Sequence, residues 1–466
     1  MHRTAPAPPR EPDEPRAPAA KFPPGPRRPL LGTLITPGRD PLALFTRLVH
    51  TYGEIAHFKL AGEHAYFLNN PQFIRDVLVT HQHNFTKSRG LERAKKLLGE
   101  GLLTSEAPAH RRQRRLLQPA FHRDRIAGYA SVMVQHADAA RSRWQDGSTF
   151  DVSKEMMRVT LAIVGKTLFS TDVESKADEV GSALTQVMAT FFLNLIPFAD
   201  VINRLPIPAL RRARAARERL DALIYQMITE RRATAVDHGD LLSTLLAARD
   251  EGGSGGLSDQ QIRDEAMTLL LAGHETTANA LTWTWYLLSQ NPEAEATLHQ
   301  EIDRALEGRL PSMADLSRLP FVERVVTESM RLYPPAWIIG RRAIADYPVA
   351  GYIAPARSLI FMSPYIMQRD ARFYAEPDRF EPDRWTPEFK AALPPFAYFP
   401  FGGGARKCIG DQFALMEIAL ILATVAQQWK LQLVPGHRAV AQPLITLRAK
   451  HGMVMTATRR SSSRVM

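Results

Sequence analysis

The feature that most constrains this chain is a single cysteine inside a glycine-rich stretch. Residues 401–410 read Phe-Gly-Gly-Gly-Ala-Arg-Lys-Cys-Ile-Gly, and Cys408 is the only cysteine among the 466 residues. Because a lone cysteine cannot form an internal disulfide, Cys408 is a buried apolar side chain, a reactive thiol or a metal ligand. Three successive glycines let the backbone turn sharply and approach a flat group closely. The stretch therefore predicts a tight loop that presents the thiol.

The residues after this loop predict a helix. Residues 411–428 carry apolar side chains at helical spacing, so Cys408 lies just before a helix N-terminus. Unpaired amides and the positive end of the helix dipole stabilise a thiolate there. A thiolate without a second cysteine suits the axial position of a haem iron, whereas a zinc site or an iron–sulfur cluster needs further soft ligands. A phosphate-binding loop is disfavoured, because neither the Walker pattern nor G-x-G-x-x-G fits the stretch.

The composition indicates a soluble globular protein. Hydrophobic residues make up 45% of the chain and charged residues 23%, and no apolar run approaches the ~18 residues of a membrane span. Residues 1–20 are rich in proline and charge and lack the apolar stretch of a secretory signal. We predict a disordered tail over residues 1–20, one domain over 21–458 and a basic tail over 459–466. The expected location is the cytoplasm, without a transmembrane anchor.

The formal net charge of +11 raises the hypothesis of a nucleic-acid-binding protein. The excess lies in separate arginine runs near residues 111–115, 211–219 and 459–464, without interleaved aromatic side chains or a known binding motif. An acidic protein partner or solvated helix faces fit this pattern better, so no nucleic acid is expected. For the arginine-rich helix predicted around residues 210–228, a solvated surface and a contact with a membrane surface both remain open.

Most of the chain is predicted to be helical, with small β-sheets. Residues 55–60 and 65–68 predict a β-hairpin, and residues 337–361 alternate as strands do. Residues 369–400 read as proline-rich coil. The clearest helix begins at the capping-box pattern Ser-x-x-Gln of residues 258–261 and continues to about residue 291. At ~1.5 Å per residue, such a helix is long enough to cross the molecule.

The middle of this long helix reads Ala-Gly-His-Glu-Thr-Thr, which a core helix would avoid unless the segment lines a cavity. Small Ala272 and Gly273 would then leave room for a ligand beside the backbone. Threonine hydroxyls such as that of Thr276 can bond carbonyls of the preceding turn, and Glu275 and Thr276 could pass protons inward. His274 is expected on the surface or as a satisfied core histidine. An exposed polar patch on the helix is the alternative interpretation.

Two further pairs of side chains lie at helical spacing. Glu328 and Arg331 are three residues apart and can form an ion pair, which Arg379 could join as a third member. His110 and Arg114 are one turn apart in arginine-rich surroundings. Together they could hold an anionic group such as a carboxylate.

With these residues in view, the chain resembles the cytochrome P450 family of haem-thiolate monooxygenases, over nearly its whole length from about residue 22. The family's haem-binding motif, Phe-x-x-Gly-x-Arg-x-Cys-x-Gly, is met at Phe401, Gly404, Arg406, Cys408 and Gly410. The Glu-x-x-Arg helix, the Pro-x-Arg-Phe segment at residues 377–380 and the Ala-Gly-x-Glu-Thr-Thr segment of the long helix also stand in the family's order.

The resemblance implies a mainly α fold with small sheets, with haem b (iron protoporphyrin IX) between the long central helix and the helix after the Cys408 loop. Cys408 would be the axial ligand of the iron. The other expected cofactor-binding residues are Phe401, His110, Arg114, Arg341 and Arg406, of which the last four would meet the haem propionates.

The same resemblance assigns roles to other residues. Glu275 and Thr276 would be the catalytic groups that deliver protons during oxygen activation. Glu328, Arg331 and Arg379 would be structural. The side chains expected to face the substrate are Leu103, Ala272, Ala336 and Trp337.

The implied reaction is the hydroxylation or epoxidation of a hydrophobic small molecule, of fatty acid, terpenoid or polyketide type, with O2. The apolar segment 191–196 fits such a substrate. Electrons would come from a separate ferredoxin- or flavodoxin-type donor with its NAD(P)H reductase. We expect an acidic donor to dock at Arg111, Arg112, Arg115 and Lys407. Alternatives are a haem-thiolate isomerase, dehydratase or peroxygenase, and a haem-binding sensor or carrier.

Overall fold

The computed structural model describes residues 22–26, 40–171, 177–189, 207–234, 236–248 and 256–460. The predicted tail over residues 1–20, the apolar segment 191–196 and residues 461–466 lie outside these ranges. Within them the chain is mainly helical with four small sheets, which confirms the predicted fold class. Across these same ranges, none of the helices is both long and apolar enough to cross a membrane.

Helix α12 (Asp259–Gln290) runs through the molecule, as the sequence predicted. Its 32 residues span about 48 Å at ~1.5 Å per residue. The Ser258 side chain accepts the Gln261 amide N–H, and the Gln261 side chain accepts that of Ser258, so the predicted capping box is confirmed. The helix is buried on most sides. A helix covered all round belongs to the core of a large domain, and α12 forms that core.

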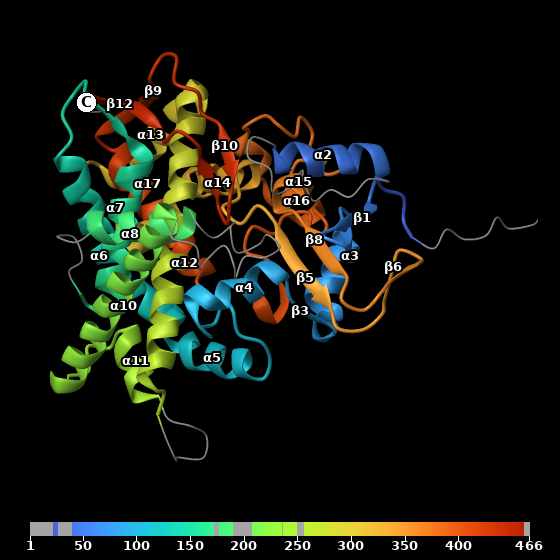
Figure 1. The fold of residues 1–466 in the computed structure, drawn as a ribbon. Helices are drawn as coiled ribbons and strands as arrows, with labels where there is room; N and C mark the ends of the chain where they lie inside the picture. The colour runs from blue at the N-terminus through green and yellow to red at the C-terminus, as the bar shows by residue number, and fades with distance from the viewer. Residues whose placement is uncertain are drawn as a thin grey trace, which may run out of the picture.

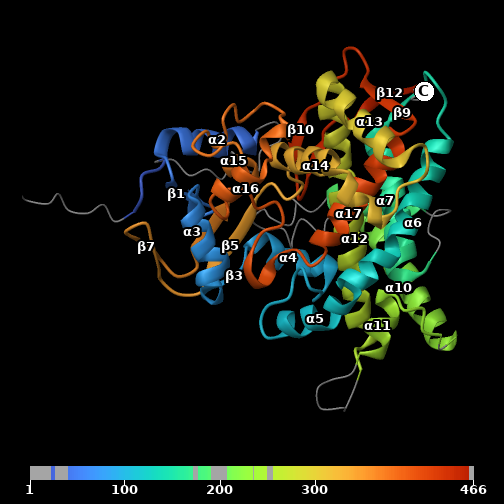
Figure 2. The ribbon, with the colours of Figure 1, turned by 180° about the vertical axis from the view of Figure 1, so that it is seen from behind.

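The helices packed on α12 build the larger part of the molecule. They are α7 (Val152–Phe169), α10 (Pro208–Thr234), α14 (Pro320–Leu332) and α17 (Asp411–Ala426), and α17 in turn packs on α6 (Arg123–Ser142). Helix α17 is the helix predicted after the Cys408 loop, and it is buried over nearly all its length. Figures 1 and 2 show this helical part on one side of the molecule and a sheet-containing part on the other.

The sheet-containing part is organised around a five-stranded sheet of order β1-β2-β8-β5-β3. The strands are β1 (Ile55–Leu60), β2 (Glu63–Leu68), β3 (Phe85–Lys87), β5 (Ile339–Ala343) and β8 (Leu359–Met362). Strands β2 and β8 are parallel, and the other neighbours are antiparallel. The predicted hairpin is confirmed, with a shorter turn than expected: only Ala61 and Gly62, both at positive φ, separate its strands.

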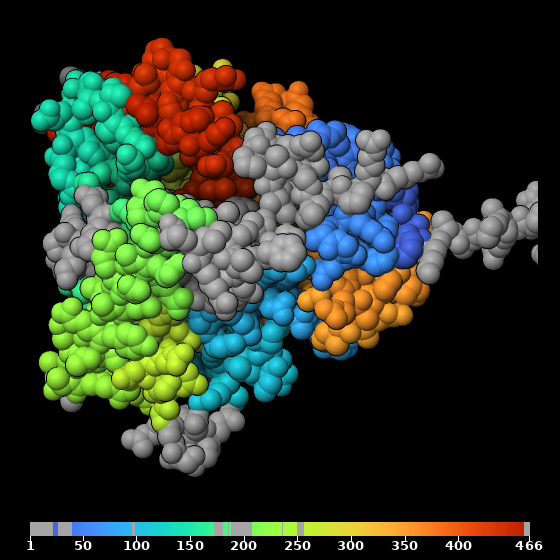
Figure 3. Space-filling model, in the orientation of Figure 1, coloured from blue at the N-terminus to red at the C-terminus, as the bar shows by residue number. Residues whose placement is uncertain are grey.

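The C-terminal strand β12 (Val454–Arg459) pairs with β4 (Thr149–Asp151) and β9 (Trp429–Leu433). Figure 3 shows these C-terminal residues in red beside the teal residues near position 150. The predicted basic tail therefore begins too early, because Arg459 lies within β12 and Arg460 forms a 2.7 Å ion pair with Asp303. Both residues belong to the folded body.

The remaining elements are short or peripheral. They are α2 (Pro41–Tyr52), α3 (Pro71–Arg75), α4 (Arg89–Leu98), α5 (Ala109–Leu117), α8 (Ala177–Ala189), α11 (Leu241–Ala247), α13 (Pro292–Leu306), α15 (Pro364–Met367), α16 (Pro387–Ala392), β6 (Tyr347–Val349), β7 (Tyr352–Ala354), β10 (Ala441–Pro443) and β11 (Leu447–Ala449). The segment 369–400, predicted as coil, thus contains a helix, because proline is accepted in the first turn of one.

Candidate functional site

The Cys408 loop is closed by its own backbone. The Cys408 amide donates to the Phe401 carbonyl at 3.0 Å, and the Lys407 amide donates to the Gly404 carbonyl at 3.0 Å. Helix α17 begins at Asp411, so the predicted position of the thiol just before a helix N-terminus is confirmed. The loop therefore fixes the thiol relative to the helix that packs on α12.

The glycines of this loop make close contacts with protein, where the sequence suggested a flat ligand. Gly404 has φ +67°, and a Cβ there would collide with the Leu78 carbonyl. A Cβ at Gly403 would collide with the Phe396 ring. Both glycines are needed for the loop to pack against its neighbours, and this packing holds the cysteine in place.

The protein alone favours the neutral thiol at Cys408. The residue is accessible to solvent, yet enough protein surrounds its sulfur that burial raises the pKa of the thiol. The Gly410 amide and the cationic Arg114 and Lys407 oppose this effect without cancelling it. The Gly410 amide at the helix start thus favours a thiolate, as expected, but by itself it does not outweigh the effect of burial. A metal cation bound to the sulfur supplies what is missing, because it deprotonates a coordinating thiol.

A group of basic side chains, three of them buried and Arg406 half-buried, lies beside the loop, and we call it the cationic cluster. It consists of Lys87, His110, Arg341 and Arg406, with Glu106 as the acid beside them. Arg406 donates to Glu106 and, at 3.3 Å, to the Ser105 carbonyl. These side chains come from β3, α5, β5 and the Cys408 loop, which are far apart in sequence.

The charges of the cationic cluster are not balanced. Burial and, after it, the neighbouring charge of Arg406 lower the pKa of Lys87 to about 7 and that of Arg341 to about 10. Burial and four cationic neighbours lower the pKa of His110 to about 3, so its imidazole is neutral. Such unfavourable pKa values are expected where buried cations await an anion. The two carboxylates of a porphyrin match this excess of positive charge.

Arg114 lies against the Cys408 loop. Its guanidinium donates to the Lys407 carbonyl at 2.6 Å, which ties α5 to the residue before the cysteine. The charge of Arg114 also acts on His110, so the two side chains lie near each other. Their joint contact with a haem propionate stays a prediction.

Lys87 was missed by the sequence interpretation. Its amide donates to Glu106, and its ammonium donates to the Leu102 and Ser105 carbonyls at 2.8 and 2.7 Å. The sequence did carry a signal, because Phe85 and Lys87 alternate on one face of a strand. A lysine on the same face as a buried phenylalanine is buried too, and it needs polar partners.

The polar middle of α12 is divided between two faces. Ala272 is exposed and Thr276 is partly exposed, and the Thr276 hydroxyl donates to the Ala272 carbonyl at 2.8 Å, as predicted. Gly273 instead faces α7, where a Cβ would lie 3.0 Å from Val164. Its missing side chain serves helix packing, which corrects the expectation that it leaves room for a ligand. His274 is a satisfied core histidine, bonded to the Leu270 carbonyl.

Glu275 is buried and held by the C-terminal hairpin of β10 and β11. Its carboxylate accepts from Arg448 Nε at 2.8 Å and from the Thr446 hydroxyl. Burial opposes ionisation, but these bonds outweigh it and hold the pKa of Glu275 below its usual range. The acid next to Thr276 is therefore an ionised carboxylate. The sequence did carry a signal for these partners, because Thr446 and Arg448 are two residues apart and side chains at this spacing share one face of an extended segment.

The predicted Glu328–Arg331 pair is confirmed, and its third member is corrected. Arg331 Nε and Glu328 Oε2 are 2.7 Å apart, and both side chains are fully buried. Arg384 and Trp385 also bond the Glu328 carboxylate, each at 2.9 Å. The Arg379 side chain instead pairs with Glu376 at the surface. Only the Arg379 carbonyl takes part, by accepting from Arg331.

The residues expected to face a substrate have different environments. Ala336 and Ala272 are exposed, and Leu103 is half-buried against the core around α12. Trp337 is 5% exposed, packs beside Phe45 and donates to the Leu444 carbonyl at 2.7 Å. The structure thus places Trp337 in a hydrophobic core and removes it from the substrate-facing set.

These features define a class of protein. A thiol held at the start of a buried helix and an adjacent excess of cations fit an iron porphyrin, bound through sulfur and through its two carboxylates. The comparisons with known proteins agree. The sequence model of cytochrome P450 matches residues 23–455, and the chain belongs to this family. Its cofactor is haem b, and it is a monooxygenase, which incorporates one atom of O2.

Two relatives and one solved structure illustrate the similarity. Cyclooctatin synthase of Streptomyces melanosporofaciens is 41% identical over 90% of this chain and 92% of that protein. Pentalenene oxygenase of Streptomyces avermitilis is 40% identical over 85% and 88%. The structure of a retinoic acid-bound cyanobacterial CYP120A1 has a TM-score of 0.83 and 26% identity, over 94% of this chain and 99% of that chain. The predicted fold and family are confirmed.

Proposed function

We propose that this monooxygenase hydroxylates or epoxidises a terpenoid and receives its electrons from a separate acidic protein. The observation that carries the choice of substrate is the similarity to cyclooctatin synthase and pentalenene oxygenase, at 41% and 40% identity over most of the chain. Among the fatty acid, terpenoid and polyketide classes, these names favour the terpenoid.

The residues of the site suggest a division of work. Cys408 would ligate the iron, while Arg341, Arg406 and the neutral His110 would meet the porphyrin carboxylates. The bound haem supplies the oxygen chemistry, and the protein supplies binding, orientation and water exclusion. The Thr276 hydroxyl, on the exposed side of α12, would hold and pass a proton. Glu275, ionised and buried, would accept the next one.

Replacing Thr276 tests this role. In Thr276→Ala we expect less product per electron consumed and more hydrogen peroxide, because the hydroxyl that orders proton delivery is gone. Thr297→Ala, on the exposed side of α13, is the matched control. Equal coupling in the wild type and Thr276→Ala would contradict the role.

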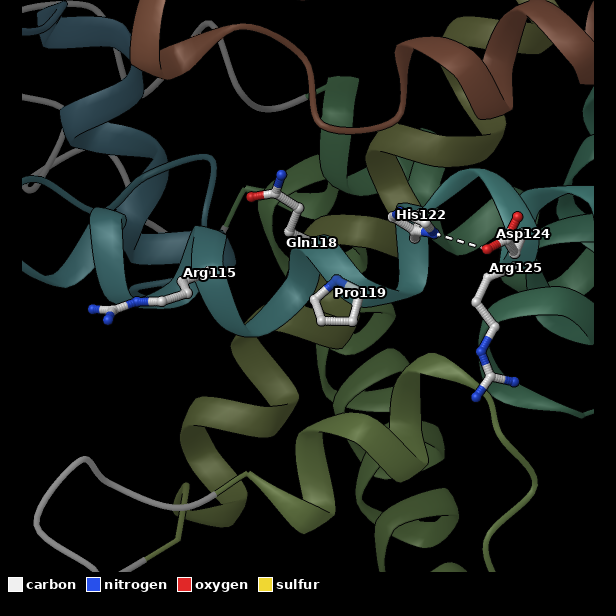
Figure 4. A pocket seen from close by; sticks show the side chains of 6 residues that line it. All are labelled: Arg115, Gln118, Pro119, His122, Asp124 and Arg125. Carbon is white, nitrogen blue, oxygen red and sulfur yellow. Dashed lines mark ion pairs between the residues drawn. The ribbon is translucent and has the colours of Figure 1, made fainter.

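An electron donor would dock on the α5 side of the Cys408 loop. Arg111, Arg115 and Lys407 are exposed there. Figure 4 shows the residues that line an open recess at the end of α5, with Arg115 at one end, Pro119 in the middle, and Arg125 at the other end beside the His122–Asp124 pair. Phe121, in the same segment, packs edge-on against Phe413 of α17. An acidic ferredoxin or flavodoxin, supplied by an NAD(P)H reductase, would thus lie close to the thiol.

Charge reversal tests the docking surface. Arg111→Glu with Arg115→Glu should lower the rate of reduction about tenfold at low ionic strength, and less at high salt. The control is Arg211→Glu with Arg219→Glu on the exposed face of α10, which changes the net charge equally. Equal rates and equal salt dependence in both variants would exclude this surface.

Binding spectra test the substrate proposal. The reduced, carbon monoxide-bound protein should show the red-shifted Soret band of thiolate-ligated haem. A panel of terpenoids, fatty acids and polyketides is then screened for the spin-state change caused by binding, followed by product analysis. Product from terpenoids with the reductase system supports the proposal. Turnover without electrons, or with peroxide alone, would favour an isomerase, dehydratase or peroxygenase, and ligand binding without turnover would favour a sensor or carrier.

A further inference from the structure

The loop of residues 99–105, between α4 and α5, lies directly on α12. The Glu100 amide donates to the Asp264 carboxylate at 2.8 Å, and the Leu102 amide donates to the Glu265 carboxylate at 2.9 Å. Gly101 has no room for a Cβ, which would collide with Thr268. The loop, which also carries Leu103, is thus fastened to the central helix by its amides.

Lys87 fastens the same loop by its carbonyls. The ammonium, on a side chain that is 6% exposed, donates to the Leu102 and Ser105 carbonyls at 2.8 and 2.7 Å. Leu102 is therefore held from both sides, its N–H by Glu265 and its C=O by Lys87. The lysine also belongs to the cationic cluster, which we call the porphyrin-carboxylate site because it would meet the haem carboxylates. One charge is thus shared by the loop and this site.

The interface between the loop and α12 contains buried polar atoms that form no hydrogen bond within the part of the chain that the structure describes. Glu265 Oε1 and Thr268 Oγ1 are buried and have no hydrogen-bond partner among the described residues. A buried polar atom without a partner destabilises the closed loop, and hydration on opening would remove this cost. The closed loop is therefore a candidate two-state element whose balance a single charge can shift.

We propose that Lys87 couples the porphyrin-carboxylate site to the loop of residues 99–105. The carboxylates of bound haem hold the Lys87 ammonium in its charged form, and the charged ammonium keeps the loop closed on α12. By linkage, closure of the loop in turn strengthens haem binding. The inference depends on the haem cofactor and is independent of the substrate and the electron donor.

The electrostatics around Lys87 agree with this coupling. Burial lowers its pKa to about 7, so without haem the Lys87 ammonium can lose its proton near neutral pH. Burial also raises the pKa of Glu265 to about 7, against the opposing effect of Lys87. Haem carboxylates would raise the pKa of the lysine and restore its charge. The groups that act on the ammonium are Arg406, Arg341, Lys95, His110, Glu106 and Glu265.

Hydrogen exchange of the full chain tests the coupling without turnover. The haem-free protein is reconstituted with haem b or with haem dimethyl ester, which keeps the iron but has no carboxylate charge. We expect haem b to raise the protection of residues 99–105 about tenfold more than the ester does. Lys87→Met should abolish this difference, whereas Lys87→Arg and the exposed control Lys59→Met should keep it.

Two outcomes would overturn the proposal: equal protection by haem b and its ester in the wild type, or a difference that persists in Lys87→Met. The absorption spectrum of each sample shows whether the thiolate ligates the iron, so a failure of haem binding is seen separately. If Lys87→Met does not bind haem, the wild type decides. In the wild type, residues 99–105 must be better protected with haem b than with the ester, and equal protection would contradict the inference.

Discussion

Two of the groups of buried and half-buried charges in this fold differ in how their charges are balanced. We call the first the Glu328 network: Glu328, Arg331, Arg384 and Glu381, with Trp385 as a further donor. Each carboxylate in it has an arginine partner, and Arg331 also donates to three backbone carbonyls. The cationic cluster contains three basic groups and a neutral histidine, and its facing carboxylates are Glu106 and, from α12, Glu265.

The difference separates structure from binding. A network whose donors and acceptors all meet within the protein gains nothing from a ligand, and it serves to hold α14 to the segment of residues 368–385. A cluster that keeps surplus cations out of water is costly until an anion arrives. Buried charge is thus a weak sign of function by itself, whereas unbalanced buried charge is a strong one.

The largest expected effect comes from breaking the balanced network. Arg331→Ala should lower the free energy of unfolding by ~3–5 kcal/mol, because it leaves the Glu328 carboxylate buried with fewer donors. Chemical denaturation of the haem-free and haem-bound protein measures this change. Arg379→Ala is the matched control and should leave the stability unchanged, because its side chain pairs only with exposed Glu376. Comparable losses in both variants would mean that Arg379 belongs to the network after all.

Breaking the cationic cluster should have a smaller effect with a different signature. In Arg341→Met we expect the haem-free protein to be as stable as the wild type or more stable, because a cation that repels Lys87 and Arg406 is gone. Haem affinity should fall about 10- to 100-fold, as for the loss of a charge-assisted hydrogen bond. Haem transfer to a scavenging protein measures the affinity. A large loss of haem-free stability would place Arg341 with the structural charges.

Glu275 lies between the two cases, since it has one arginine partner and lies beside the predicted proton donor. Arg448→Gln should raise the pKa of Glu275, because burial is then no longer outweighed by the ion pair. The pH at which product per electron reaches half its maximum should shift upward, with a loss of coupling of a few fold at neutral pH. Arg448→Lys, which keeps the charge, should retain most of the wild-type profile. An identical profile in Arg448→Gln would mean that Glu275 takes no part in proton delivery.

Motifs with fixed spacing could be predicted from the sequence. The Cys408 loop, the capping box at Ser258 and the Glu328–Arg331 pair are local, and local spacing determines which atoms meet. The long central helix and the hairpin of β1 and β2 could also be predicted, because local sequence patterns determine both.

Contacts between distant segments could not be predicted in this way. Lys87 meets Arg341 and Arg406 only because β3, β5 and the Cys408 loop pack together. The prediction that Arg379 joins Glu328 was wrong. Arg379 and Arg384 belong to the same irregular segment, and the sequence does not show which of them faces inward. In the structure Arg384 bonds Glu328, and Arg379 pairs with Glu376 at the surface. Trp337 was predicted to face the substrate from the position of its segment in the chain. In the structure its side chain packs into the hydrophobic core that contains Phe45.

The last expected effect is a pH dependence of stability, to which the cationic cluster contributes through Lys87. Lys87 has a folded pKa of about 7, below the ordinary 10.5, so the unfolded chain binds more protons between these values. The free energy of unfolding of the haem-free protein should therefore rise with pH from about 7 to 10. Lys87→Met should flatten this slope and Lys59→Met should not, as denaturation curves at each pH will measure. Haem b should also flatten it, because its carboxylates raise the folded pKa toward the unfolded one. A wild-type slope that survives both Lys87→Met and haem binding would have to come from other groups, and the charge imbalance would then lose its main thermodynamic consequence.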